Sequence, residues 1–425
     1  MATALHRGLS PLRTVLPNGA TLIAEQTATH PAVTLYLSLE AGSGHDPDDR
    51  LGLGHFVAKV IDRGTASRSA DQLAEAFDDR GVSLSVNVSR HLMTFTCTCL
   101  ADDVADVLGL VAEVMRQPAF APDQVEKRRN SILTSLRQDD DNPAVVATEG
   151  LMATLYPGGH PYGRRGKGTA SSVQAITRDD LVSFHHAHAG PAGLRVVIVG
   201  DVPRERAAAL AEAAVGDWDA GCEPGLLPPA PPAIAHRSLR TVEMPGKAQS
   251  DVAYGFATIA RADLRYFPLV LMNTVLGQYG LGGRLGDSIR ERQGMAYYVF
   301  SGFEANVAPG PLAVRAGVNP ANVERAIASI DDELERMARD GVTPAELDDA
   351  KRYLVGSMPR TLETNGGIAA FLHSADFYDL GLDYDERLPG LIEAVTLDEV
   401  QAVAREFLVP ARASIVVAGP SGAAV

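Results

Sequence analysis

The sequence is poor in the residues on which several protein classes depend. Only 3 of its 425 residues are cysteine, which excludes a disulfide-stapled scaffold and favours a reducing compartment. No uninterrupted apolar run reaches the ~18 residues of a membrane-spanning helix, and residues 1–13 lack the apolar core of a signal peptide. We therefore expect a cytoplasmic protein that does not associate with membranes.

Basic side chains are also scarce. The chain has 38 Lys and Arg residues against 53 Asp and Glu residues, which gives a formal net charge of −15. A general nucleic-acid binder needs clustered cations at the phosphates, so this class is excluded. The glycines of residues 278–286 match neither the dinucleotide-binding nor the phosphate-loop spacing, so nucleotide binding is not indicated either.

The remaining composition is that of a globular protein. Hydrophobic residues make up 46% and charged residues 21% of the chain, which is typical of proteins with substantial cores, and the length predicts about two to four domains. Cys97 and Cys99 share a strand face with Phe95, so we interpret both as small buried side chains. Cys222 lies in a predicted loop.

An internal duplication determines the domain organisation. Residues 176–202 and 395–421 each contain a helix, then a proline, then an apolar strand that ends at glycine. Pro191 and Pro410 are 219 positions apart. Each helix begins at a threonine that is followed three residues later by an acidic residue, as in a capping box. This agreement predicts two copies of one structural unit.

A second pair of segments supports the duplication and places its boundaries. Helices predicted to begin at Pro122 and Pro344 are 222 positions apart. Residues 222–238 are rich in proline and indicate a semi-rigid linker. We therefore predict two homologous α+β domains, residues 1–221 and 239–425, each a mixed, mostly antiparallel sheet with helices packed on one face.

Local patterns in the first half fit this architecture. The dipeptide Asn18–Gly19 predicts a hairpin, and alternation over residues 33–39 predicts a strand with one apolar face. A helix is expected at residues 51–62. Another is expected to begin at Ser69, which has Gln72 three residues on, as in a capping box.

Several stretches, taken in order, resemble one family. Residues 40–65, 160–169, 282–303 and 315–327 are similar to the insulinase/pitrilysin-like (M16) metallopeptidases, a clan that includes the mitochondrial processing peptidase. Together with the duplication, the resemblance spans nearly the whole chain. It implies the LuxS/MPP-like metallohydrolase fold.

The resemblance also exposes a loss. Active members of this family carry H-x-x-E-H on a helix, where the two histidines bind Zn²⁺ and the glutamate activates water. The corresponding positions here are His55, Phe56, Val57, Ala58 and Lys59. Only the first ligand is kept. Alanine cannot take a proton, and the lysine would repel the metal.

The downstream ligand positions have changed as well. The third-ligand glutamate position falls at Ser135 and the supporting glutamate position at Arg128. We expect Lys59 and Arg128 to occupy space that zinc fills in active relatives. Because a single imidazole is not a zinc site, the resemblance implies no cofactor in this chain and zinc in a partner subunit.

Four other histidines are candidates for metal ligands. His185 and His188 are three apart on a predicted helix, which would allow a two-ligand surface site. With no cysteine or third ligand nearby, we interpret His185, His186 and His188 as part of a polar helix face. His160 is interpreted as a structural loop residue.

The second half keeps a feature that the first half has lost. Arg290 is expected near a helix end, Gly294 in the turn after it, and Tyr297 at the start of the next strand. In the resembled family this Arg/Tyr pair hydrogen-bonds the substrate backbone, and guanidinium and phenol are suitable donors. Tyr298 is expected on the opposite strand face. The alternative is an ordinary surface arginine and a packed tyrosine.

Three functional hypotheses follow from the resemblance. The leading one is a non-catalytic subunit, inactive alone, that forms half of a clamshell chamber and binds unfolded peptide beside a homologous partner with an intact H-x-x-E-H motif. The second is a zinc-free homodimeric peptide-binding or scaffold protein. The third is an active metallopeptidase with an unrecognised site. Co-purification with a zinc-bearing partner, or as a self-dimer, distinguishes the first two.

Overall fold

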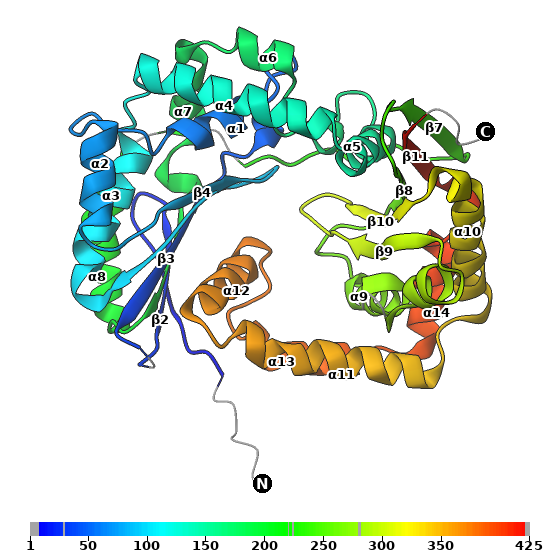
Figure 1. Ribbon diagram of the computed structural model, residues 1–425. Helices are drawn as coiled ribbons and strands as arrows, with labels where there is room; N and C mark the ends of the chain where they lie inside the picture. The colour runs from blue at the N-terminus through cyan, green and yellow to red at the C-terminus, as the bar shows by residue number, and fades with distance from the viewer. Residues whose placement is uncertain (1–7, 29, 220, 223–224, 279–281, 421–425) are drawn as a thin grey trace. The chain divides into compact units, whose positions relative to one another are not determined.

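The computed structural model describes residues 8–28, 30–219, 221–222, 225–278 and 282–420. The described chain forms two compact units, each built on one β-sheet (Figure 1). The segments of unit 1 are those up to Leu136, Arg165–Leu226 and Ser357–Arg387. The segments of unit 2 are Arg137–Arg164, Leu227–Gly356 and those from Leu388 onward.

The sheet of unit 1 has the order β1-β2-β6-β3-β5-β4. Its strands are β1 (Leu12–Val15), β2 (Thr21–Gln26), β3 (Ala32–Leu39), β4 (Ser85–Val88), β5 (Met93–Leu100) and β6 (Arg195–Gly200). All neighbours are antiparallel except β2 and β6, which run parallel. The predicted hairpin at Asn18 and Gly19 joins β1 to β2, and Gly19 has the positive φ of 92° that such a turn requires.

The sheet of unit 2 repeats this arrangement. Its order is β7-β11-β8-β10-β9, again with one parallel pair, β7 and β11. The strands are β7 (Ser238–Glu243), β8 (Ser250–Ala257), β9 (Ala296–Phe303), β10 (Pro311–Val318) and β11 (Ser414–Gly419). This order and direction match β2-β6-β3-β5-β4 strand for strand. The predicted α+β fold with a mixed, mostly antiparallel sheet is confirmed, but helices cover both faces of each sheet, so the prediction that they pack on one face is wrong.

Helices pack on both sheets. Those that lie wholly or mainly in unit 1 are α1 (Leu53–Val60), α2 (Ala70–Asp78), α3 (Val104–Arg116), α4 (Pro122–Asp140), α6 (Ala170–Ala175), α7 (Arg178–His188), α8 (Arg204–Val215) and α12 (Asn365–Phe377). Those of unit 2 include α5 (Pro143–Leu155), α9 (Tyr266–Asn273), α10 (Val323–Asp340), α11 (Pro344–Thr361), α13 (Tyr384–Glu393) and α14 (Leu397–Phe407). The predicted capping boxes begin α2, α7 and α14. Among the described residues, no helix combines the length and apolarity needed to cross a bilayer.

The two halves of the chain exchange a helix. Helix α5, from the first half, packs on β8 and β11 of unit 2, and α12, from the second half, packs on β3 and β6 of unit 1 (Figure 1). The first residues of these helices, Pro143 and Asn365, are 222 positions apart, the spacing of the second repeat pair. The sequence-based segments 1–221, 222–238 and 239–425 therefore describe the repeat, whereas the compact units cross them at these helices.

Cysteines have the structural role that the sequence predicts. Cys97 and Cys99 are buried and free, on the same face of β5 as Phe95. Burial raises the pKa of the Cys97 thiol to about 12 and that of Cys99 to about 11, so both remain neutral thiols at physiological pH. Cys222 is half-buried and free.

Polar contacts hold α12 on the sheet of unit 1. His373 Nε2 and Ser38 Oγ are hydrogen-bonded at 2.7 Å in a buried position. Asp376 accepts from Arg13 Nε at 2.7 Å and from Arg195 Nε at 3.1 Å. Burial, with a smaller contribution from the Arg195 charge, lowers the pKa of His373 to about 4. The native state therefore requires a neutral imidazole at this contact.

This requirement predicts a pH dependence of stability. In the unfolded chain histidine has a pKa of about 6.5, so the stability that depends on neutral His373 is complete above that pH and is lost as the pH falls toward 4. Lowering the pH from 7 to 5 should therefore reduce the unfolding free energy of both proteins, and that of the His373→Gln variant by about 2 kcal/mol less than that of the parent. Urea unfolding at both pH values measures this difference. Equal losses in parent and variant would contradict it.

Candidate functional site

Helix α1 carries the positions of the zinc motif. The Asp46 carboxylate caps its first turn by accepting from the backbone N–H groups of Gly52, at 2.7 Å, and Gly54, at 2.8 Å. The apolar residues of α1 point into the core of unit 1, while His55 is half-buried and Lys59 is exposed. His55 and Lys59 are four positions apart, which places both on one helix face. Ala58, at the position of the general base, is buried.

Helix α4 carries the downstream positions. Arg128 and Ser135 are seven residues apart, two turns along one face, and both are half-buried. Ser135 Oγ accepts a hydrogen bond from Lys167 Nζ at 3.3 Å. The guanidinium of Arg129 lies 5.1 Å from the centre of the Phe56 ring, which brings α4 against α1.

Positive charge exceeds negative charge where α1 and α4 meet. The Asp62 carboxylate lies 3.1 Å from Arg63 Nε. Burial raises the pKa of Asp62, although Arg63, Arg128 and Lys59 all act in the opposite direction. Burial and the Arg63 charge lower the pKa of Arg128. One carboxylate thus lies among three cationic side chains.

Zinc does not fit this donor set. Structural and catalytic zinc sites use thiolate, imidazole or carboxylate ligands. The motif positions instead offer one imidazole, at His55, together with a methyl group, an ammonium, a guanidinium and a hydroxyl. Over the residues that the structure describes, no group of three or more His, Cys, Asp or Glu is arranged to hold a metal ion.

The prediction that His185 and His188 lie on a polar helix face is wrong. Both are buried, and His185 Nε2 lies 2.7 Å from the carbonyl oxygen of Met115. The His188 ring packs against Phe184 at 4.6 Å between ring centres. An imidazole that is satisfied by a backbone carbonyl can replace an apolar side chain in the core, and burial lowers the pKa of His185.

His160 has the structural role that was predicted. It is buried in unit 2, and its Nδ1 accepts from the backbone N–H of Tyr162 at 3.0 Å. Its Nε2 lies 2.9 Å from the carbonyl oxygen of Pro229. Both ring nitrogens therefore contact backbone polar atoms, and neither is directed to an open site.

Arg290 and Tyr297 flank a tight turn in unit 2. Arg290 lies in η7 (Gly286–Arg292), and its carbonyl oxygen accepts from the backbone N–H of Gly294 at 3.0 Å. Gly294 has a φ of 62°, which favours glycine. Tyr297 is 75% exposed, whereas Tyr298 on the opposite face of β9 bonds to the buried Asp251. The geometry predicted for the turn and for the two tyrosines is confirmed.

The backbone of η7 has a form that the sequence did not predict. Both η7 and η5 (Thr274–Gln278) are π-helical. Segments of this kind are rare and often occur at functional sites. Residues 279–281, between these two segments, lie outside the described residues, so the glycine-containing stretch 278–286 is described only in part.

The Arg290 side chain keeps much of its donor capacity. It is 42% exposed, and its nearest recorded acidic partner is Glu291, with Arg290 Nε 3.8 Å from Glu291 Oε1. This distance is longer than a hydrogen bond. A guanidinium in this state can bond a peptide carbonyl or carboxylate without first breaking a strong internal contact.

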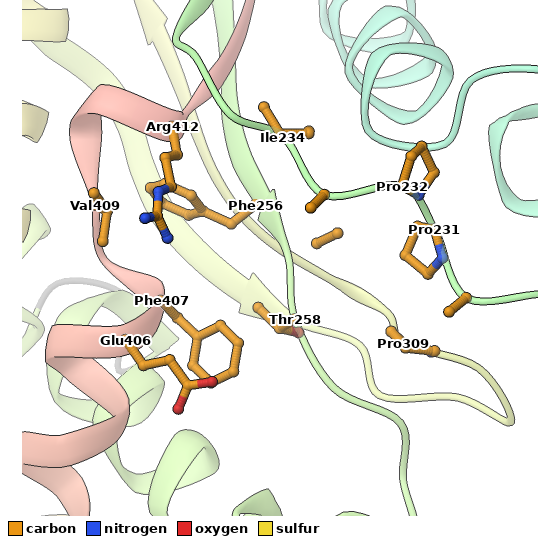
Figure 2. A pocket seen from close by; sticks show the side chains of 13 residues that line it. Pro231, Pro232, Ile234, Phe256, Thr258, Pro309, Glu406, Phe407, Val409 and Arg412 are labelled. Carbon is orange, nitrogen blue, oxygen red and sulfur yellow. The ribbon is translucent and has the colours of Figure 1, made fainter.

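A cavity of about 310 Å³ lies elsewhere in unit 2 (Figure 2). The proline-rich segment 230–234 forms one wall, and Phe256 and Phe407 contribute to the lining. Glu406 and Arg412 bring charge to it, but the Glu406 carboxylate already accepts from Arg265 at 2.6 Å. The predicted linker thus packs in part against unit 2, and this cavity offers no pair of groups suited to acid–base chemistry.

Comparisons with known proteins agree with the fold. Residues 21–164 match the family described as insulinase (peptidase family M16), and residues 175–354 match the peptidase M16 inactive domain. A protein of Mycobacterium tuberculosis named an uncharacterized zinc protease is 30% identical over 97% of this chain and 94% of its own length. One of the same description from Streptomyces coelicolor is 28% identical over 96% and 89%.

Solved structures give the same result. A peptidase M16 inactive domain from Pseudomonas fluorescens has a TM-score of 0.89 and 28% identity over 97% of this chain and 98% of that one. A protease from Helicobacter pylori has a TM-score of 0.90 at 19% identity over 97% and 100%, which supports the fold. The fold is that of two-unit proteins related to the M16 peptidases. The chain belongs to peptidase family M16.

Two features of the site were missed from the sequence. Lys167 belongs to residues 160–169, a stretch whose sequence indicates the family resemblance but no role for the lysine. Its contact with Ser135 depends on the fold. Asp62 and Arg63 are adjacent and begin two residues after the motif helix, so these opposite charges beside the helix were a usable signal.

The two adjacent tyrosines give a matched test of the turn. The Tyr298 hydroxyl donates to Asp251, so Tyr298→Phe removes a donor from a buried carboxylate and should lower the unfolding free energy by about 1–2 kcal/mol. Tyr297→Phe changes an exposed side chain and should stay within about 0.5 kcal/mol of the parent. Denaturant unfolding measures both, and equal losses in the two variants would contradict this geometry.

Proposed function

We propose that this chain is the non-catalytic subunit of a heterodimeric M16-type zinc peptidase. It would form half of a clamshell chamber and bind unfolded peptide through Arg290 and Tyr297. The observation that carries the proposal is a contrast between the two units. In unit 1, four of the five ligand and base positions hold residues unsuited to zinc chemistry. In unit 2, the Arg/Tyr pair is intact and accessible.

The chemistry of the pair suits substrate binding. Arginine offers five N–H donors in a planar fork and the tyrosine hydroxyl offers one more. Donors of this kind hold the carbonyl oxygens of an extended peptide, and they would orient a scissile bond toward chemistry supplied by another subunit. Neither side chain needs to leave a buried partner to do so, because Tyr297 is exposed and Arg290 has only the distant Glu291 contact in the described structure.

The partner would be a homologous chain with an intact H-x-x-E-H motif, and zinc would be held there. Three free cysteines support a reducing compartment such as the cytoplasm. Zinc in the partner accounts for an M16 chain whose own motif positions include Lys59 and Arg128, since both cations would repel the ion.

Metal analysis tests the assignment of zinc. The purified chain should contain no stoichiometric zinc and should cleave no peptide, whereas co-expression with the partner should give one zinc per heterodimer and peptidase activity. In that complex, His55→Ala should leave the zinc content unchanged, because His55 is not a ligand in this proposal. One tightly bound zinc per chain in the isolated protein would overturn it. A self-dimer without a zinc-bearing partner would favour the homodimeric peptide-binding alternative.

Substitution of the pair tests substrate binding. Arg290→Ala should lower peptide turnover by the complex about tenfold to a hundredfold, the range expected when hydrogen bonds from a charged donor are lost, and Tyr297→Phe should lower it less. Arg339→Ala is the matched control, because this exposed arginine on α10 pairs with Asp340. Initial rates on a fluorogenic unfolded peptide measure the effect. Unchanged turnover in Arg290→Ala would show that the arginine does not bind substrate.

A further inference from the structure

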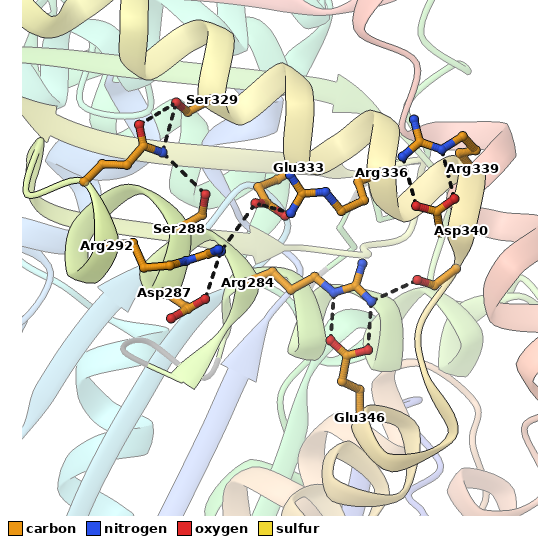
Figure 3. Close-up of polar contacts among 12 residues, drawn as sticks. Arg284, Asp287, Ser288, Arg292, Ser329, Glu333, Arg336, Arg339, Asp340 and Glu346 are labelled. Atoms are coloured by element: carbon orange, nitrogen blue, oxygen red, sulfur yellow. Dashed lines mark hydrogen bonds and ion pairs between the residues drawn. The ribbon is translucent and has the colours of Figure 1, made fainter.

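We propose that Glu333 and Ser329 on α10 are positioning residues for the turn between Arg290 and Tyr297. This inference rests on the proposed role of that pair in peptide binding. The two α10 residues are four apart and therefore share one helix face. Figure 3 shows this face of α10 opposite the segment that contains Ser288 and Arg292. Polar contacts from α10 would hold the turn in its binding geometry.

The first contact joins Ser329 to the residue that begins the turn. The Gln293 side-chain amide and the Ser329 hydroxyl are hydrogen-bonded, with Gln293 Nε2 3.2 Å from Ser329 Oγ. The same Nε2 lies 3.5 Å from Ser288 Oγ. Gln293 is otherwise exposed and directly precedes Gly294. Fixing its side chain fixes the point at which the chain leaves η7.

The second contact is a buried carboxylate. Glu333 is 1% exposed, and its Oε1 accepts from Arg336 Nη1 at 3.0 Å. Arg292 Nη2 lies 4.0 Å from the same oxygen and 3.0 Å from Asp287 Oδ2. A buried charge keeps its place only when its partners stay. Arg292, two residues after Arg290, therefore faces the buried Glu333 carboxylate at a distance longer than a hydrogen bond, and the attraction between the two charges orients it toward α10.

The repeat shows that these polar residues are not required by the fold. Helices α3 and α10 occupy the same place in the two halves, each after the last hairpin strand. At the 219-residue spacing, Ser329 corresponds to Leu110 and Glu333 to Val114, both buried in the apolar core of unit 1. A serine and a glutamate at such positions cost stability unless they serve another purpose.

The segment η7 packs into the core on one side and borders a polar cavity on the side that faces α10. Ile289 is fully buried and holds the segment to the core. Toward α10, a cavity of about 260 Å³ separates the elements. Its lining is polar and consists of Ser288, Arg292, Gln293, Ser329, Asp332, Glu333 and Arg336. With open volume on this side, the side-chain contacts across the cavity fix how η7 presents Arg290.

Peptide affinity of single and double variants tests the proposal in the full-length chain. The probe is fluorescein-labelled lysozyme that has been reduced and carboxymethylated, a polypeptide that cannot refold, and fluorescence anisotropy gives its Kd. Glu333→Gln should raise the Kd about threefold to tenfold, the effect expected for coupled neighbours. In the Arg290→Ala background, the same substitution should have no further effect, because the residue it positions is gone.

Asp331→Asn is the matched control. Asp331 also lies on α10, but it pairs with Arg237 at 2.9 Å and accepts from the Tyr254 hydroxyl at 2.8 Å. Its replacement should lower the melting temperature without changing the Kd. An effect of Asp331→Asn on the Kd as large as that of Glu333→Gln would overturn the proposal, because loss of α10 stability would then explain both.

The outcomes separate this inference from the proposed function. If Arg290→Ala leaves the Kd unchanged, the proposed function fails. If Arg290→Ala raises the Kd but Glu333→Gln does not, or if their effects add in the double variant, the positioning proposal alone is overturned. Should Glu333→Gln fail to fold, Gln293→Ala and Ser329→Ala provide the same comparison, since neither removes a buried charge.

Discussion

The structure depends on the need to cover both faces of each central strand. Every residue of β11 is buried, and so are nearly all residues of β6 and β8. Strands that are apolar on both faces require cover on both sides. In unit 1, Ile23, Val197 and Val199 meet α12, while alternate residues of the same strands enter the larger core. Unit 2 uses α5 in the same way. In each unit, one face of the sheet is thus covered by a helix from the other half of the chain.

Much of the fold was predictable because it is encoded locally. The capping boxes at Ser69, Thr177 and Thr396 need only a side chain and a backbone N–H within one turn. The repeat spacing gave the common topology. The helix exchange could not be predicted, because α5 and α12 stand at the same place in each repeat whichever sheet they cover. Long-range packing decides which sheet a helix covers, and the repeat in the sequence does not indicate that packing.

The candidate site was predictable to a different extent. The resemblance located the motif positions at His55, Ala58 and Lys59, and spacing alone placed the first and last on one helix face. The burial of His185 was missed because its partner is a backbone carbonyl from a distant helix, which side-chain patterns do not reveal. The π-helical form of η7 was missed for a related reason. A change in backbone hydrogen-bond register leaves no periodic signal in seven residues.

Comparison of equivalent positions shows how the two units have diverged. Between the first long helix and the edge strand, unit 1 has α2, a regular helix that is followed by Gly81 with a φ of 61°, and unit 2 has η7, followed by Gly294 with a φ of 62°. The glycine turn is therefore common to both, whereas the helix before it is not. In unit 1 the neighbouring helix α3 offers Leu110 and Val114 to the core, and in unit 2 the corresponding side chains are Ser329 and Glu333. In unit 1, the regular helix α2 is thus accompanied by apolar residues at these positions of α3. In unit 2, the π-helical η7 is accompanied by polar residues at the equivalent positions of α10. The π-helical segment that carries Arg290 and the polar residues of α10 beside it thus occur together in unit 2, next to the turn that leads to Tyr297.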